Sequence, residues 1–280
     1  MKGYKGFNPG LICKDKQYQE NTVFEEPEAK ICEKGMHFCE NPFDVLDYYD
    51  LIRSDGTPNE FTEVEALDEP KTDDKKKFCS RKLKIGVKLG LSGFIKACVD
   101  FVLEKTLAEM PSENVISGDY AKIGSSGDSA KIGSSGDSAK IGSSGDYAKI
   151  GSSGDYAQIG SSGYSAQIGS SGNSAKIGSS GDYAQIGSSG NSARISSSGN
   201  SARISCTGSD SVICCAGHDS VVKAPVGCWI TLAEWKYDGA KQRYVPVCVK
   251  TEYIDGEKIK ADTPYMLENG EFVEADSDGE

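Results

Sequence analysis

A nine-residue repeat runs through the middle of this 280-residue chain. The unit reads G-D-(Y/S)-A-(K/Q/R)-I-G-S-S, and its first glycine recurs twelve times in phase, from Gly118 to Gly217. A fixed short period is typical of a solenoid, in which each repeat needs its neighbours to bury a core. The repeat therefore predicts a rod built by stacking.

The unit itself predicts a β-strand. Ala121 and Ile123 lie two residues apart with Lys122 between them, and this spacing places both apolar side chains on one face of a strand. The segment Gly-Ser-Ser-Gly-Asp that follows would end any helix within a turn. We expect the glycines to provide the positive φ that tight turns require. The fold class is thus expected to be mainly β, with a nonapeptide-repeat β-solenoid (a β-helix or β-roll).

We favour two repeats, or eighteen residues, per coil, because one unit cannot close around a core. Twelve units would then give six coils and a rod of roughly 29 Å at the usual spacing between paired strands. A three-sided coil of three units is the alternative.

The rod has an expected core and an expected binding surface. The core ladder is the isoleucine column: Ile123, Ile132, Ile141, Ile150, Ile159, Ile168, Ile177, Ile186, Ile195, Ile204 and Ile213. The outward column between alanine and isoleucine holds these cations: Lys122, Lys131, Lys140, Lys149, Lys176, Arg194 and Arg203. A column of carboxylates accompanies it: Asp119, Asp128, Asp137, Asp146 and Asp155. We expect the two outward columns to form the surface that binds a partner.

We expect no metal site and no cofactor. The calcium-binding nonapeptide roll reads G-G-x-G-x-D-x-U-x, and a calcium ladder should keep its carboxylates. Here the aspartate position changes in several units: Tyr164, Asn173, Asn191, Asn200, Ser209 and His218.

Two smaller regions flank the rod, which spans residues 111–225. Residues 1–110 have the composition of an α+β domain, with an expected helix over residues 42–52 that begins at Asn41 and Pro42. Strands are expected over residues 60–67 and 82–89, and a second helix from Ser92.

Residues 226–280 are expected to form a β cap with an acidic tail. Both tryptophans of the chain, Trp229 and Trp235, follow the last repeat directly, and we expect them to cover the end of the core. Asp255-Gly256 and Asn269-Gly270 are typical hairpin turns. The final residues, EADSDGE, form the acidic tail.

His37 is the candidate catalytic or ligand-binding residue. It is the only histidine of the N-terminal region, and Cys13, Cys32 and Cys39 are near it in sequence. The alternative is a half-buried histidine at a strand end with no chemical role, because a lone histidine without an identified partner is a weak indication of a site.

The charge and hydropathy of the chain exclude several classes of partner. The chain holds 31 Lys and Arg against 42 Asp and Glu, a formal charge of −11. General binding to DNA or to anionic lipid needs a basic face, so we expect neither. No segment approaches the 18 or so apolar residues of a membrane span, and no apolar leader follows the N-terminus, so we expect a cytoplasmic protein.

Several segments resemble an uncharacterised family of proteins from bacteriophages, prophages and gut metagenomes. These segments are KGYKGF at the start, CEKGMHFCENPFDVLDYY (residues 32–49), the nonapeptides, GCWITLAEW (residues 227–235) and DGEKIKAD (residues 255–262). The resemblance implies a phage setting, with action in the host cytoplasm, and no particular chemistry. The stretch GMHFC (residues 35–39) is also similar to a strand of ADP-ribosyltransferase-like domains, although no catalytic glutamate or nicotinamide-binding arginine stands at that family's spacing.

Three functions are consistent with these features. The first is a phage-encoded, non-enzymatic binding protein whose capped solenoid docks on a host protein or ribonucleoprotein, for example to inhibit a host-defence or nucleic-acid-processing complex. The second is an ADP-ribosyltransferase-like enzyme in the N-terminal domain. The third is a structural or fibre component of a virion. Each of the three functions is compatible with a homo-oligomer.

Overall fold

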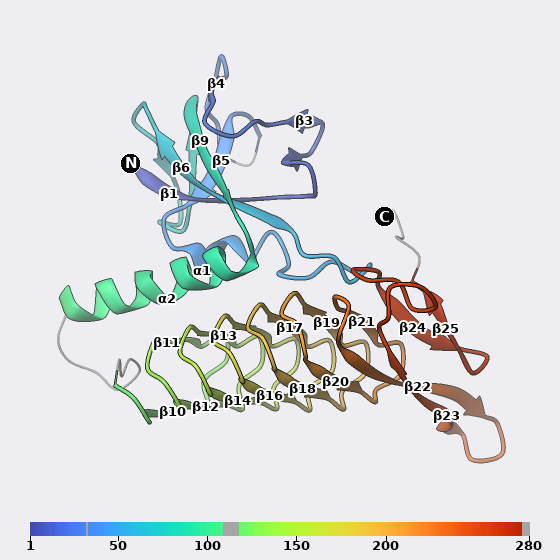
Figure 1. The fold of residues 1–280 in the computed structure, drawn as a ribbon. Helices are drawn as coiled ribbons and strands as arrows, with labels where there is room; N and C mark the ends of the chain where they lie inside the picture. The colour runs from blue at the N-terminus through green and yellow to red at the C-terminus, as the bar shows by residue number, and fades with distance from the viewer. Residues whose placement is uncertain (32, 109–117, 276–280) are drawn as a thin grey trace.

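The computed structural model describes residues 1–31, 33–108 and 118–275 (Figure 1). The chain is mainly β, with 6% helix and 46% strand, and a β-solenoid of about six turns occupies residues 122–232 between small flanking regions. The expected fold class is confirmed. The expected boundary at residues 110 and 111 lies outside the described residues.

Each coil of the solenoid contains two repeats. β10 (Lys122–Ser125) pairs in parallel with β12 (Lys140–Ser143), so that Ile123 lies opposite Ile141, two units later. We call the sheet formed by alternate repeats the open sheet: β10, β12, β14 (Gln158–Ser161), β16 (Lys176–Ser179), β18 (Arg194–Ser197) and β20 (Val212–Cys215). The other repeats form the covered sheet: β11 (Lys131–Ser134), β13 (Lys149–Ser152), β15 (Gln167–Ser170), β17 (Gln185–Ser188), β19 (Arg203–Cys206) and β21 (Val221–Lys223). The three-unit coil is therefore excluded.

The core of the solenoid is the stacked isoleucine column, in which every side chain is at most 5% exposed. The alanine column lines the same interior. A third inward column, which the sequence analysis missed, is the serine that directly follows the Ile-Gly pair of the repeat, such as Ser152 and Ser161. Among the described residues, no hydrogen-bond partner is found for the hydroxyls of Ser152 and Ser161. Cys206 and Cys215 take this position near the C-terminal end.

The turns do not use glycine in the way that the sequence analysis expected. The residue with positive φ is the third of each unit, for example Tyr156 at 58° and Ser165 at 52°, and no glycine of the described nonapeptide units has a positive φ. The turn glycine is needed for space instead. A Cβ at Gly136 would overlap the carbonyl oxygen of Gly118, one coil earlier, and the same overlap recurs up to Gly217. Glycine therefore allows the turns to stack.

The aspartate column binds the next coil. The Oδ1 atom of Asp119 accepts a hydrogen bond from the backbone N–H of Asp137 at 3.0 Å, and Asp137 does the same for Asp155 at 2.8 Å. Asn173 replaces Asp at this position and still accepts from Asn191 at 3.0 Å. An acceptor oxygen is sufficient for this bond, which explains why Asp changes to Asn along the array.

Each solenoid sheet continues into a C-terminal hairpin. β22 (Trp229–Asp238) adds in parallel to β20 and pairs with β23 (Arg243–Tyr253). On the other side, β24 (Tyr265–Glu268) pairs with β21 and with β25 (Glu271–Glu274). The two hairpins form the cap at the C-terminal end of the rod (Figure 1). Residues 276–280 of the expected acidic tail lie outside the described residues.

The end of the solenoid core is covered mainly by Ile230 and Leu232, and not by the two tryptophans that the sequence analysis expected. Ile230 and Leu232 are buried and continue the core, whereas Trp229 is 48% exposed. Trp235 is half-buried and donates its Nε1–H to the carbonyl of Ala216 at 2.9 Å. Successive side chains of β22 point to opposite faces of the sheet, and the odd-numbered residues from Trp229 to Trp235 face away from the core.

The N-terminal region contains an antiparallel seven-stranded sheet in the order β4-β9-β6-β1-β5-β8-β7. Its strands are β1 (Lys2–Phe7), β4 (Val23–Glu25), β5 (Met36–Cys39), β6 (Glu60–Ala66), β7 (Lys71–Thr72), β8 (Lys77–Ser80) and β9 (Lys82–Leu89). A small hairpin joins β2 (Ile12–Cys13) and β3 (Lys16–Gln17), and the helices are α1 (Pro42–Val45) and α2 (Leu91–Ala108).

Helix α1 is shorter than expected. The Asn41 side chain caps it by accepting from the backbone N–H of Phe43 at 3.0 Å, as its sequence indicates. The helix ends at Val45 instead of continuing to Ile52. Leu51 and Ile52 are buried, and the backbone N–H of Ile52 bonds to Gln185 of the solenoid. Docking on the solenoid thus overrides the local helical pattern.

Candidate functional sites

The two solenoid sheets present the same outward residues in different surroundings. The outward column of the covered sheet is Lys131, Lys149, Gln167, Gln185, Arg203 and Val221. The corresponding column of the open sheet is Lys122, Lys140, Gln158, Lys176, Arg194 and Val212. Two residues further along each strand, a second outward column is glycine through most of the rod on both sheets.

The N-terminal domain neutralises the cations of the covered sheet. Lys131 forms an ion pair with Asp44, and the buried Lys149 forms one with Asp47. The Lys149 Nζ atom also donates to the carbonyl of Phe43 at 3.0 Å. A buried ammonium is stable only when it is paired and hydrogen-bonded in this way.

Two further members of this column, Gln185 and Arg203, also bond to the N-terminal domain. Gln185 accepts a hydrogen bond from the backbone N–H of Ile52 at 3.2 Å. Arg203 donates from Nε to the carbonyl of Ser54 at 2.8 Å. The outward column of the covered sheet is therefore an intramolecular interface along most of its length.

Helix α2 lies against the glycine column of the covered sheet, along β11 to β17 (Figure 1). A Cβ added at Gly187 would lie 3.1 Å from Leu91, one at Gly169 would lie 2.7 Å from Ile95, and one at Gly151 would lie 3.3 Å from Val99. The absence of side chains at these glycines is what lets the helix pack close to the sheet.

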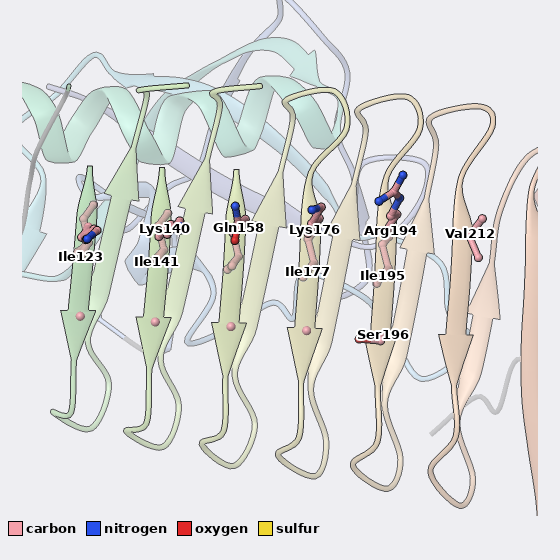
Figure 2. Close-up of a pocket in the computed structure, with 16 residues that line it drawn as sticks. Ile123, Lys140, Ile141, Gln158, Lys176, Ile177, Arg194, Ile195, Ser196 and Val212 are labelled. Atoms are coloured by element: carbon pink, nitrogen blue, oxygen red, sulfur yellow. The ribbon is translucent and has the colours of Figure 1, made fainter. Parts of the chain in front are cut away.

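The open sheet has no such cover among the described residues. Its two outward columns line a shallow groove of about 870 Å³ (Figure 2). A Cβ added at Gly124, Gly142 or Gly160 would meet nothing within 4 Å. The lining residues include Lys122, Lys140, Lys176 and Arg194 and no carboxylate. The groove is therefore cationic, and none of the residues that the structure describes covers it.

The C-terminal end of this groove is apolar and aromatic. Val212 is 51% exposed and lies beside Trp229, which follows it in the sheet. The rings of Trp229 and Tyr253 lie 5.1 Å apart between centroids. The open face thus changes from a row of cations to an exposed apolar cluster, which we call the aromatic end and define as Val212, Trp229 and Tyr253.

The binding surface expected from the sequence is divided by the structure. Lys131, Lys149 and Arg203 face the N-terminal domain, while Lys122, Lys140, Lys176 and Arg194 face outward. The carboxylates of Asp119, Asp128, Asp137, Asp146 and Asp155 accept backbone bonds from the next coil. The sequence holds one indication of this division: Phe94, Ile95 and Cys98 give the helix after Ser92 an apolar face, which needs a surface to cover.

His37 lies in a second candidate site, a cavity of about 830 Å³ in the N-terminal domain. Lys5 of β1 is only 5% exposed there, and its Nζ atom donates to the His37 carbonyl at 2.9 Å. Tyr49 contributes a hydroxyl that donates to the Cys13 thiol at 3.0 Å. The sequence analysis named His37 and Cys13 but missed Lys5. The one available indication was that Lys5 lies among glycines and aromatic residues in the segment KGYKGF. Cys32 lies outside the described residues.

Burial shifts the pKa of three groups in this cavity, Lys5, His37 and Cys39. Burial lowers the pKa of Lys5. Burial, together with the positive charges of Lys5, Lys77 and Lys14, lowers the pKa of His37 to about 4, so the imidazole is neutral at pH 7. Burial and the charge of Asp44 raise the pKa of Cys39 to about 12, which leaves its thiol protonated and a poor nucleophile. The lining of the cavity carries both signs of charge, because carboxylates accompany its lysines: Asp15, Glu26, Glu28 and Glu33.

No cluster of three or more His, Cys, Asp or Glu side chains is placed to hold a metal ion within residues 1–31, 33–108 and 118–275. In the same part of the chain, no helix combines the length and the apolar character that crossing a membrane requires.

Comparison with known proteins gives one match. Searches of curated proteins and of solved structures found none. Residues 1–97 match a domain of unknown function (DUF7666), a segment that includes the seven-stranded sheet, the His37 cavity and the first part of α2 and leaves the solenoid outside the match.

Proposed function

We propose that this is a non-enzymatic binding protein that docks a macromolecular partner on the open sheet of its solenoid. The observation behind this proposal is the difference between two faces with the same repeat. The N-terminal domain contacts the cations and glycines of the covered sheet, whereas no residue of the described ranges covers the equivalent groove on the open sheet.

The physical properties of the open sheet suit recognition. Its strands are held by parallel pairing on both sides through most of the rod, so binding would order few groups, and a preorganised surface retains more of its interaction energy. The aromatic end supplies the type of side chain that is enriched at protein interfaces.

The charge of this face indicates an acidic partner. The chain as a whole has an excess of acidic residues, but the charged residues that line the groove are all positive. Local complementarity steers association more strongly than net charge, because charges further away than about 10 Å are screened by salt.

The setting of the interaction follows from the sequence resemblance. Proteins of phages and prophages act inside a bacterial host, so a host protein or ribonucleoprotein is the proposed partner, and inhibition of a host-defence or nucleic-acid-processing complex is the proposed outcome. Location in the host cytoplasm is part of the same proposal.

The test is co-purification from the cells in which the protein is made. We expect a stoichiometric partner with the wild type and its loss with the groove variants Lys140→Glu/Lys176→Glu and Gly160→Leu. A control pair, Lys2→Glu/Lys84→Glu, makes the same charge change at exposed residues of β1 and β9, away from the solenoid. A partner that is retained by both groove variants would refute the proposal.

A second function is favoured by the cavity around His37. We propose that the N-terminal domain binds a small molecule there, a step that an ADP-ribosyltransferase-like enzyme would also need. Incubation with labelled NAD and lysate tests the enzymatic form: transferred label would support it, and undiminished transfer by His37→Ala would remove His37 from the chemistry. Absence of both transfer and NAD binding would refute that form.

A further inference from the structure

We infer that the open sheet binds an amphipathic α-helix with an acidic flank, contributed by the partner. This inference rests on the proposed function and names the segment that would fill the groove. Its basis is the chain itself. On the covered sheet, helix α2 packs on the glycine column, and carboxylates of the N-terminal domain, beside that helix, pair with the cation column.

The glycine column sets the spacing of the apolar contacts. On the covered sheet, Leu91, Ile95 and Val99 of α2 each face one of the glycines of successive coils. Four residues of an α-helix rise about 6 Å, and neighbouring coils are about 4.8 Å apart. An aliphatic residue at every fourth position therefore nearly matches the coil spacing, and the open glycine column offers the same sites.

The cation column sets the charge of the bound segment. Lys131 and Lys149 lie in adjacent strands and are paired with Asp44 and Asp47 of the N-terminal domain. Lys122 and Lys140 are the equivalent adjacent pair on the open sheet. A carboxylate three or four residues from another on one side of a helix would reach both.

The length of the groove limits the length of the helix. From Lys122 to Arg194 the cation column crosses four coil spacings, or about 19 Å. This length corresponds to roughly 13 helical residues. Helix α2, with 18 residues, extends along β11 to β17 of the opposite sheet.

The aromatic end indicates a large apolar residue at one end of the bound helix. On the covered sheet, the equivalent Val221 is 3% exposed and packs near Gly56 of the N-terminal domain. On the open sheet, Val212 remains half-exposed beside Trp229. A leucine, methionine or aromatic side chain on the partner would cover this cluster.

Two other occupants fit the groove less well. A second copy of the chain, placed with its open sheet against this one, would bring two cation columns together. A single-stranded nucleic acid would need aromatic side chains along its path for base stacking, and the groove between Lys122 and Arg194 is lined by Lys, Gln, Gly, Ile and Ser without any aromatic residue.

The experiment is a selection from a displayed library of random peptides about as long as α2, with the full-length protein as target. We expect the enriched peptides to contain several carboxylates and aliphatic residues at every third or fourth position. A synthetic copy of one of them should become helical on binding, as measured by circular dichroism.

The matched variants show where the peptide binds. In fluorescence anisotropy, binding should weaken about tenfold or more in Gly160→Leu and in Lys140→Glu/Lys176→Glu, and should stay unchanged in Lys2→Glu/Lys84→Glu. Gly160→Leu is expected to fold, because Ser196 and Cys214 already occupy the same column.

The inference is overturned by enriched peptides that lack carboxylates, that bind in an extended form, or that bind Gly160→Leu as well as the wild type. Binding of a single-stranded oligonucleotide that is lost in Gly160→Leu would also overturn it. The proposed function fails separately, when the co-purified partner is insensitive to both groove variants. A partner that is sensitive to them but contacts the groove through a segment without acidic helical character would refute only this inference.

Discussion

The covered and open sheets of the solenoid are built from the same nonapeptide, yet they have different roles. On the covered sheet, Lys149 is buried, paired with Asp47 and bonded to a backbone carbonyl. On the open sheet, its counterpart Lys140 is exposed and lines the groove that no described residue covers. The comparison teaches that the repeat determines the shape and charge of a face, and that what packs on the face determines its role.

The largest expected effect concerns the core that both sheets share. Ile159→Asp places a carboxylate among isoleucines that are almost fully buried, and an unpaired buried charge costs at least about 3 kcal/mol. Thermal or urea unfolding should show a large loss of stability. Gln158→Glu, on the outer face of the same strand, should change the free energy of unfolding by less than about 0.5 kcal/mol. Equal unfolding of the two variants would mean that the faces are assigned wrongly.

A turn glycine should be far less replaceable than a groove glycine. In Gly163→Ala, the new Cβ would overlap the carbonyl of Gly145 in the previous coil, so we expect destabilisation of about 1–3 kcal/mol or more. In Gly160→Ala the Cβ meets nothing within 4 Å, and stability should be unchanged or higher by up to about 1 kcal/mol. Denaturant titration measures both. A tolerated Gly163→Ala would contradict close stacking of the turns.

The two glycine columns should respond differently to the same substitution. Gly169→Leu would push against Ile95 and separate α2 from the covered sheet, whereas Gly160→Leu lies in the groove of the open sheet. Hydrogen exchange followed by mass spectrometry should show faster exchange of the α2 amides in Gly169→Leu only. Similar exchange in the two variants would show that the sheets do not differ as described.

The smallest expected effect concerns the buried serine column. The hydroxyl of Ser152 is fully buried, and no partner for it is found among the described residues. Because an unsatisfied buried hydroxyl costs about 1–3 kcal/mol, Ser152→Ala should be neutral or mildly stabilising in thermal unfolding. Marked destabilisation would show that the hydroxyl bonds to something within the coil.

The periodicity of the sequence was sufficient to predict the strands and coils of the solenoid, but not how closely successive coils pack. Alternation of Ala121, Lys122 and Ile123 predicts the strand and its inward face, because these are local properties of a repeated unit. The role of the turn glycines depends on how closely successive coils approach, which no single unit contains. Tyr156 adopts positive φ where glycine was expected, since the available glycine is needed for the close approach instead.

The candidate site was only partly predictable for a related reason. The cation column was identified, but Lys131 and Lys149 could not be separated from Lys122 and Lys140 without knowledge of where the N-terminal domain packs. The same packing shortened α1, because Leu51 and Ile52 contribute to the interface instead of to a helix. Contacts between the N-terminal domain and the solenoid therefore determine which lysines are covered and where α1 ends, and local sequence patterns do not contain them.

The most direct test is photo-cross-linking in the producing cell from a benzophenone side chain placed at position 158, where the exposed Gln158 lines the groove beside the glycine column, compared with one at position 84. The account predicts one discrete adduct from position 158, attached to an acidic helical segment of a single protein, and no such adduct from position 84. No adduct from position 158, or the same adduct from both positions, would contradict it.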